Sequence, residues 1–324
     1  MKYLVFILML FSLVSCGAAK NTSKGTRNDS AVRITHSAPK SSQNPCFSPD
    51  GQSLIFTRFL NGYNVGPSEI VKIKTDGSEE TIIVPAGESD NVNVPYGSWV
   101  GHTICFASDR GGASDEIWIA DDDGKHLRQI TTHPEGGGIY YIEPVFNPQN
   151  THQIVFEYVT GEEDKTARHQ IAFLDVDTGQ VTVLTDGTYD DRLPSWSHDG
   201  KQILFQRKQY DQDEGWRVYT ADITTSPTAA IHALKLIYFG KGDYTDCSWN
   251  FDDTYVLSSS PFDGIAVPNI WQFPLDASRS PIRSTHTRDI EDGAPAQSPD
   301  GRQIAFESHY GDSEEVPSEI WIIQ

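Results

Sequence analysis

The strongest constraint on the fold is a segment that occurs six times along the chain. Each copy begins at an anchor residue, passes through a short turn, and continues into an apolar run with a second marker residue. The anchor and marker pairs are Phe47 with Phe56, Trp99 with Phe106, Phe146 with Phe156, Trp196 with Phe205, Trp249 with Ser258, and Gln297 with Phe306. Successive anchors lie 52, 47, 50, 53 and 48 residues apart. Such a period is typical of repeat architectures in which each copy is one supersecondary unit.

Each copy also has a second half with two further strand-like segments. In the second copy these are residues 116–120 and 127–131, separated by an Asp-Gly turn. Polar and apolar residues alternate in them, and β-branched and aromatic types are frequent. The apolar run at residues 227–237 is interpreted as the outer strand of copy four. Each copy is therefore predicted to hold four antiparallel strands, A to D, and six such units predict an all-β, six-bladed β-propeller.

The sixth copy has strands A to C and no strand D, because the sequence ends at Gln324, directly after "EIWII". An unpaired outer edge would then be exposed. Residues 31–37 ("AVRITHS") read like the D strands around Ile130 and Leu184. We therefore expect residues 31–37 to complete the last blade and close the ring, with the propeller spanning residues 31–324. Because the chain then ends, we expect no catalytic domain after it.

The first 15 residues have the pattern of an export signal. Lys2 precedes an apolar run at residues 3–13, which is short for a membrane span. Leu13-Val14-Ser15-Cys16 resembles the lipobox of bacterial lipoproteins. That resemblance implies removal of residues 1–15 and acylation of Cys16, and several acyl chains give stable anchoring. An ordinary signal peptide with a chance cysteine is the alternative.

Two further expectations follow from this N-terminal region. Gly17 occupies the position where Asp tends to mean inner-membrane retention in Gram-negative lipoproteins, so the resemblance implies the outer membrane. Residues 16–30 are polar, without apolar periodicity, and are predicted to be a flexible, lipidated tether.

The repeat resembles the PD40 (WD40-like) repeat of TolB-type propellers over about residues 31–324. The matching residues are Pro45, Ser48-Pro49-Asp50-Gly51, Ser108-Asp109-Arg110, Pro194, Trp196, Asp199-Gly200, and Ser298-Pro299-Asp300-Gly301. Copy two lacks the Asp-Gly turn, copy five reads Phe251-Asp252-Asp253, and copy six has Gln297 in place of an aromatic residue. TolB carries an additional N-terminal α/β domain and prolyl-oligopeptidase-like enzymes add a hydrolase domain. We expect neither here.

Composition and motifs limit the possible chemistry. The net charge of −20 argues against a nucleic-acid partner. No G-x-S-x-G, H-E-x-x-H or Cys/His cluster occurs, so no catalytic residue is predicted. Cys46, Cys105 and Cys247 lack metal-ligand spacing and are predicted to be buried free thiols. We expect the protein to be a monomer.

The candidate binding face is the one formed by the loops that do not repeat. In this fold the B–C and D–A loops share one face, and the regular A–B and C–D turns share the other. Variable loops on a rigid scaffold are where binding residues concentrate. Polar residues before each A strand are predicted to crowd the channel mouth: Asn44, Asn93, Glu143, Asp191, Arg192, Asp246, Glu291 and Asp292. Loop tyrosines are predicted to add contact area: Tyr141, Tyr189, Tyr244 and Tyr310.

Several interpretations of this face stay open. Carboxylates from four blades would repel one another unless a cation or a basic ligand joins them. Ca²⁺ would suit oxygen ligands, although water and Arg192 would also suffice, so no cofactor is predicted and a channel cation is left open. The lipobox-like motif and the TolB resemblance together imply a non-enzymatic envelope lipoprotein whose propeller face binds a protein or peptide. The alternatives are a sugar-binding sensor, or a carbohydrate-active hydrolase or lyase with a metal and with His169 or His309 near Glu143 and Asp246.

Overall fold

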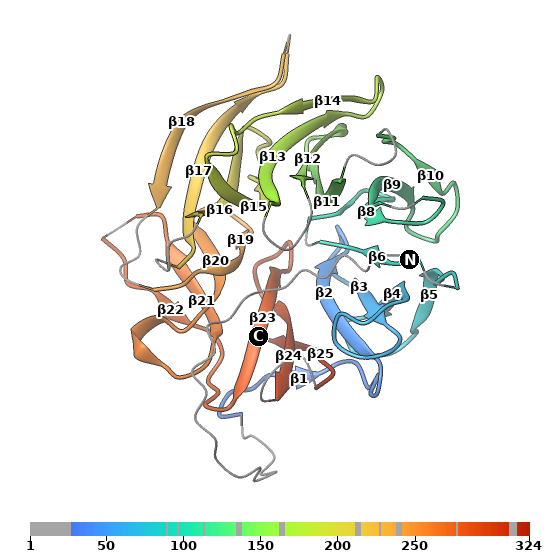
Figure 1. The fold of residues 1–324 in the computed structure, drawn as a ribbon. Helices are drawn as coiled ribbons and strands as arrows, with labels where there is room; N and C mark the ends of the chain where they lie inside the picture. Colours follow the sequence, from blue (N-terminus) through green and yellow to red (C-terminus); the bar gives the residue numbers. More distant parts are fainter. Residues whose placement is uncertain are drawn as a thin grey trace.

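Six antiparallel sheets surround a common axis, which confirms the predicted six-bladed propeller (Figure 1). Five sheets have four strands, and in the second sheet the first strand is split into two short pieces. The computed structural model describes residues 27–88, 90–95, 97–112, 114–133, 138–161, 166–210, 215–226, 228–237, 242–276, 278–310 and 316–324. Within these ranges, helical structure is confined to the short 3-10 turn η1, Phe262–Gly264.

Strands A lie nearest the middle of the ring in Figure 1. They are β2 (Ser41–Phe47), β6 (Val92–Asn93) with β7 (Trp99–Val100), β11 (Ile139–Asn147), β15 (Tyr189–Trp196), β19 (Thr245–Trp249) and β23 (Ile290–Gln297). Strands B follow, as β3 (Ser53–Phe59), β8 (Thr103–Ser108), β12 (Asn150–Thr160), β16 (Gln202–Gln209), β20 (Tyr255–Ser260) and β24 (Ile304–Tyr310).

Strands C and D form the outer half of each blade. Strands C are β4 (Ser68–Lys74), β9 (Glu116–Asp121), β13 (Arg168–Asp175), β17 (Arg217–Thr224), β21 (Asn269–Pro274) and β25 (Glu319–Ile323). Strands D are β5 (Thr81–Val84), β10 (Arg128–Gln129), β14 (Gln180–Val183), β18 (Ala230–Ile237), β22 (Ile282–Arg283) and β1 (Val32–Arg33). The interpretation of residues 227–237 as an outer strand is confirmed by β18.

The ring is closed by the N-terminal strand, as predicted, although β1 is only two residues long. Val32 pairs with Ile322 and Arg33 with Trp321, so β1 is the fourth strand of blade six. The buried carboxylate of Glu319 holds the following residues by accepting hydrogen bonds from the Thr35 hydroxyl at 2.5 Å and the Ser37 amide at 2.8 Å. A buried carboxylate needs such donors, so ring closure has polar as well as backbone contacts.

The hydrophobic core lies between neighbouring blades. Six main apolar clusters each combine side chains of two adjacent blades. Between blades one and six, for example, Phe47 and Phe56 pack with Ala296 and Ile320. One sheet cannot bury both of its faces, and radial stacking solves this problem. The prediction of buried thiols is confirmed, since Cys46, Cys105 and Cys247 are buried and form no disulfide with one another.

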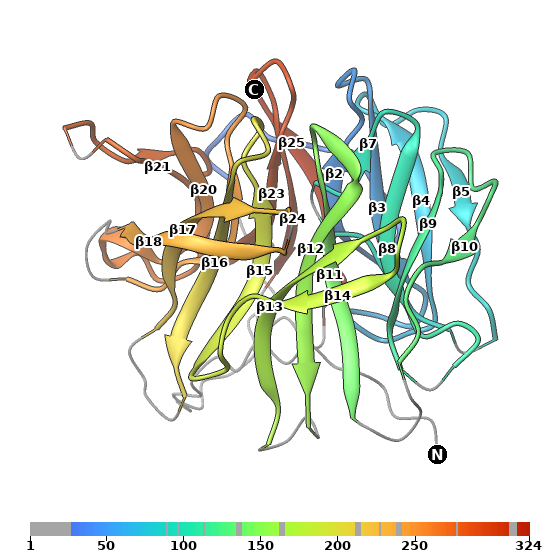
Figure 2. The ribbon, with the colours of Figure 1, turned by 90° about the horizontal axis from the view of Figure 1, so that it is seen from above.

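The A–B turns repeat in structure as well as in sequence. The Ser48 hydroxyl donates to Asp50 at 2.6 Å, and the Ser298 hydroxyl donates to Asp300 at 2.7 Å. Gly51 takes a φ of 69°, which favours glycine. In the divergent turn of blade five, Asp253 takes this conformation with a φ of 57°, and Asp tolerates it better than most residues. These turns and the chain's C-terminal end share one face of the ring (Figure 2).

Candidate functional site

Most of the innermost strands carry a β-bulge at the same position. One residue of each of five strands A has a positive φ, at Asn44, Glu143, Leu193, Asp246 and Ala294. Each of them lies within a register shift of the strand pairing. Proline follows four of these five residues, and proline in a sheet is confined to edges and bulges because it lacks an N–H. Bulges redirect side chains, so the same position in successive blades contributes to one site.

Side chains from five blades form a cluster at the axis, which we call the axial cluster: Asn44, Asn93, Glu143, Asp246 and Glu307. The Asn44 side chain donates to Asn93 at 2.9 Å, and Asn93 donates to Glu143 at 2.8 Å. The structure thus brings together four of the eight polar residues that the sequence predicted at the mouth.

The Glu157 and Glu307 carboxylates link neighbouring blades. Glu307 accepts the Asn44 backbone amide at 3.1 Å, and Glu157 accepts the Leu193 amide at 3.3 Å. Both donors are bulge residues of the next blade. Neither carboxylate is among the site residues predicted from the sequence, but both follow the marker phenylalanine of their copy as a Phe-Glu pair. Side chains alternate between the two faces of a strand, so this glutamate lies on the face opposite the phenylalanine. That alternation is the sequence signal that could have identified the glutamate as a site residue.

Burial sets the protonation of the axial cluster. Desolvation, followed by the nearby Glu157 and Asp246 charges, raises the pKa of Glu143 to about 8. Desolvation and the charge of Asp246 raise the pKa of Glu307 to about 8, and desolvation raises that of Asp246 to about 6. A raised pKa favours the neutral acid. Protonation, together with hydrogen bonds, therefore relieves the repulsion that the sequence predicted between these carboxylates.

The residues present do not fit the Ca²⁺ site that sequence analysis left open. Within the described ranges, no group of three or more His, Cys, Asp and Glu side chains could hold a metal ion. The axial carboxylates instead accept hydrogen bonds from asparagine side chains and backbone amides. Ca²⁺ requires six to eight oxygen ligands around one point, and the axial cluster does not converge in that way.

Asp191 and Asp292 have a different position from the one predicted. Both side chains are fully buried, and each is held by an arginine. Asp191 accepts two hydrogen bonds from Arg207, at 2.5 and 2.8 Å. Asp292 accepts hydrogen bonds from Arg27 at 2.6 Å to each of its oxygens. Each aspartate thus forms a buried, bidentate ion pair inside the protein, and neither is exposed at the channel mouth.

The predicted loop tyrosines also divide between core and surface. Tyr141 and Tyr244 are buried in inter-blade clusters, because their strands bring them against Phe156 and Phe273. Tyr189 is half-buried under the guanidinium of Arg207, 4.6 Å from its ring centre. Tyr310 ends β24, and its side chain lies outside the described part of the chain. Tyr141 and Tyr244 therefore contribute to packing and not to an exposed face.

His169 and His309, which the enzymatic alternative placed near Glu143 and Asp246, contact other carboxylates. His169 Nδ1 lies 2.5 Å from Glu157, and His309 Nε2 lies 3.7 Å from Glu291. The Tyr63 ring packs edge-on against His309, and its hydroxyl donates to Glu307 at 3.1 Å. The loop of blade one that carries Tyr63 thereby reaches across to blade six.

An aromatic and cationic group lies on blades three and four, within β15, near the ends of β13 and β16, and in the loop between β16 and β17. This group, the blade-four patch, comprises Arg168, Arg192, Lys208, Tyr210 and Trp216. Lys208 and Arg192 lie 4.4 and 5.4 Å from the Trp216 ring centre. All five residues are at least partly exposed. Arg192 is also held by Asp190 at 2.7 Å, so its guanidinium is fixed in place.

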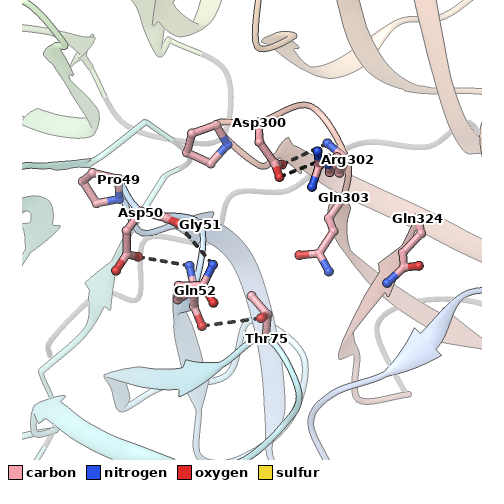
Figure 3. A pocket seen from close by; sticks show the side chains of 10 residues that line it. Pro49, Asp50, Gly51, Gln52, Thr75, Asp300, Arg302, Gln303 and Gln324 are labelled. Carbon is pink, nitrogen blue, oxygen red and sulfur yellow. Dashed lines mark hydrogen bonds and ion pairs between the residues drawn. The ribbon is translucent and has the colours of Figure 1, made fainter.

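The opposite face contains an open depression of about 720 Å³ between blades one and six (Figure 3). It is lined by turn residues that include Asp50, Gln52, Asp300 and Arg302, and by the C-terminal Gln324. In Figure 3, Asp50 is bound to Gln52 and Asp300 to Arg302, each within its own turn. The two acidic side chains of the lining are thus held by their own turns.

Residues 1–26 lie outside the described residues, and with them the predicted signal peptide, Cys16 and most of the tether. Of the last tether residues, 27–30, Asn28 donates its amide at 3.0 Å to the carbonyl of His286, in the connection between blades five and six. None of the helices in the described ranges has the length and apolar character needed to cross a membrane.

The family model described as the TolB beta propeller domain (PD40) matches residues 26–250, which is more than half of the chain. The chain belongs to this family. No curated protein sequence matches the chain significantly. The match covers the blades that contribute Asn44, Asn93 and Glu143 to the axial cluster.

Solved structures share the TolB-like fold at low sequence identity. TolB from Acinetobacter baumannii has a TM-score of 0.57 and 14% identity, over 87% of this chain and 62% of that chain. Oligogalacturonate lyase from Vibrio parahaemolyticus has a TM-score of 0.58 and 14% identity, over 93% and 98%. Puromycin hydrolase has a TM-score of 0.57 and 16% identity, over 86% of this chain and 46% of that chain. The chain thus spans less than half of puromycin hydrolase, and these likenesses show the fold alone.

Proposed function

We propose that this TolB-like propeller is a lipid-anchored binding protein of the bacterial cell envelope. In this proposal residues 1–15 direct export, acylated Cys16 holds the protein at the outer membrane, and the monomeric propeller binds a protein or peptide partner. The lipobox-like Leu13-Val14-Ser15-Cys16 supports the anchor. The partner binds at the loop face, where the blades differ most from one another.

The observation that carries this proposal is the blade-four patch. It joins a tryptophan, a tyrosine and two arginines, which are residue types enriched at the energetic centres of protein interfaces. Cations over the Trp216 and Tyr210 rings keep these side chains in defined positions before any partner binds. The patch is also a local group of cations on a chain with a net charge of −20, so it differs from its surroundings.

Hydrogen bonds between neighbouring blades support an ordered binding face. The Tyr210 hydroxyl accepts the His169 backbone amide at 2.9 Å, which links blades three and four. Tyr63 makes the corresponding link between blades one and six through Glu307. A surface that is ordered before binding loses less entropy when its partner docks.

A lyase function on an anionic oligosaccharide is the second candidate, because the lyase fold is matched over almost its whole length. Two observations disfavour it. The described residues offer no group of metal ligands. The axial cluster, made of Asn44, Asn93, Glu143, Asp246 and Glu307, also supplies no arginine or lysine to pair with the carboxylate of an acidic sugar.

The test is affinity cross-linking in envelope preparations with purified, tagged protein. Trp216→Ala should reduce the yield of the specific cross-linked partner at least tenfold, because truncation of a central interface tryptophan costs about 2 kcal/mol or more. Lys201→Ala, on a turn of the opposite face, is the matched control and should retain the partner. An identical set of partners for both variants would rule out the loop face of blade four as the binding surface.

A further inference from the structure

Blade six contains a guanidinium site that its own strands do not fill. In blade four, Arg207 on strand B holds Asp191 and lies over Phe205 and Tyr219, 5.3 and 5.2 Å from the ring centres. In the register of blade six, Ser308 stands opposite Asp292 where Arg207 stands opposite Asp191. Ser308 cannot supply a charge to the buried Asp292.

Arg27 fills this site from outside the repeat. Its guanidinium binds both oxygens of Asp292 and lies 4.9 and 4.7 Å from the ring centres of Phe306 and Trp321. Phe306 and Trp321 are paired across strands in the same way as Phe205 and Tyr219. Only 8% of the Arg27 side chain is exposed. We call this arrangement the Arg27 clamp.

The Arg27 clamp fixes where the chain leaves the propeller. Asn28 donates its amide to the His286 carbonyl, and Asp29 accepts the His286 amide at 2.7 Å. His286 belongs to the D–A segment between β22 and β23, so residues 27–29 lie on the loop face. Asp292, the partner of Arg27, belongs to the innermost strand of blade six. Arg27 is therefore fixed on the loop face, with its guanidinium beside the innermost strand of blade six.

The chain between Cys16 and Arg27 is too short to reach round the propeller. Eleven residues span at most about 38 Å when fully extended. A domain of this size has a radius of about 25 Å, and an eight-residue strand such as β23 is about 26 Å long. A path from the axis over the rim to the turn face would thus need about 50 Å.

We propose that the Arg27 clamp turns the loop face toward the membrane in the lipid-anchored protein, so that its partner is one held at the same membrane surface. This inference rests on the proposed acylation of Cys16. A partner on that surface meets the loop face directly, whereas the repeated turns face away from the membrane. The residues of the loop face still bind the partner, and the Arg27 clamp determines that this face points toward the membrane.

The test is energy transfer from the protein to the membrane. Full-length lipidated protein is incorporated into phosphatidylcholine vesicles that carry an acceptor dye on the headgroups. A donor dye is attached to Asp289→Cys, exposed in the D–A segment, or to Arg302→Cys, exposed in an A–B turn of the same blade. Cys46, Cys105 and Cys247 are buried and remain unlabelled. Transfer from position 289 should exceed that from position 302 severalfold, and equal or greater transfer from position 302 would overturn the proposal.

Two further variants separate the clamp from the anchor. Arg27→Ala should reduce the ratio between the two transfer efficiencies, whereas Arg279→Ala, a surface arginine, should leave it unchanged. Insertion of twelve Gly/Ser residues between residues 26 and 27 should bring the ratio close to one with the clamp intact. An unchanged ratio in both the Arg27→Ala and the insertion variant would contradict the proposal.

Vesicle flotation tests the anchor independently. Cys16→Ala should abolish flotation with vesicles, and if that variant still floats, the proposed lipid anchor is wrong whatever the transfer experiment shows. If flotation depends on Cys16 and the transfer ratio is one, the anchor stands and the orientation is overturned.

Discussion

Blades four and six contain the same buried ion pair, built from different parts of the chain. In blade four the arginine is 16 residues from its aspartate, on the paired strand, and in blade six it is 265 residues away. Both guanidinium groups lie over two aromatic rings. The comparison shows that blade six takes a charged residue as well as a strand from the N-terminal segment, so ring closure extends upstream of β1.

The largest expected effect comes from the local pair of blade four. Arg207→Ala leaves the Asp191 carboxylate buried without its cation, and removing one partner of such a pair costs about 3–5 kcal/mol. Urea unfolding followed by tryptophan fluorescence measures this loss. The double variant Arg207→Ala with Asp191→Asn should recover part of the stability, because the uncompensated charge is then gone. A loss below about 1 kcal/mol for Arg207→Ala would show that Asp191 is not buried as described.

The distant pair of blade six should be weaker. After Arg27→Ala, residues near the start of the described chain can separate from blade six, and water can then reach Asp292. We expect a loss of about 1–3 kcal/mol, the usual cost of an unsatisfied polar group. A double-mutant cycle of Arg27→Ala and Asp292→Asn measures the coupling in the same urea assay. Equal losses for the two blades would mean that the N-terminal segment is as firmly fixed as strand B of blade four.

The two blades also differ at one axial position, where blade four has Gln206 and blade six has Glu307. Because the folded-state pKa of Glu307 is raised from 4.5 to about 8, the folded protein binds a proton that the unfolded chain releases between these values. Stability from this group is fully present below about pH 4.5 and is lost as the pH rises toward 8. Glu307→Gln should therefore become more stable than the natural protein between pH 5 and pH 8, by on the order of 2 kcal/mol.

Thermal unfolding at the two pH values tests this, with Glu80→Gln as the control. The Arg58 side chain lowers the pKa of Glu80 by hydrogen bonding, so Glu80 stays ionised across this range. The Tm of Glu80→Gln should therefore differ from that of the natural protein by the same amount at pH 5 and at pH 8. A Glu307→Gln variant whose advantage does not grow with pH would contradict the raised pKa of Glu307.

The smallest effect should come from the turn face, where blades four and six have the same turn. Asp199 and Asp300 each accept a hydrogen bond from the serine of their own turn, which lowers the pKa of both carboxyl groups. Asp199→Ala and Asp300→Ala should lower the Tm slightly and equally at pH 7. The difference from the natural protein should shrink as the pH falls below 4, where the unmodified carboxyl groups take up protons. Unequal losses would show that the turn face is not uniform.

Much of the architecture could be predicted from local sequence. The six anchors from Phe47 to Gln297, with successive spacings of 47 to 53 residues, are sufficient for the blade count. Residues 31–37 could be assigned to the last blade because a missing outer strand and a strand-like N-terminal segment are both visible in the sequence. Asn44, Asn93, Glu143 and Asp246 could be placed at one site because they occupy equivalent positions in successive blades.

The rest required the folded chain. The sequence predicted Asp191 and Asp292 at the mouth because they precede strands A, but the partners that bury them lie on another strand and at the far end of the chain. In the sequence, Tyr141 and Tyr244 resemble exposed loop tyrosines, and only the packing of adjacent blades buries them. The partner of a charge and the depth of a side chain depend on neighbours that local patterns do not specify.

The sequence by itself determined the number of blades, the strand order and the element that closes the ring. These properties follow from hydrophobic alternation and turn residues, which act within a single copy. The tertiary structure alone decided that Arg27 serves Asp292, that Glu307 joins the axial cluster, and which aromatic residues remain exposed near Trp216. These properties depend on which blades become neighbours, because burial and charge pairing are set by distances in space and not by separation along the chain.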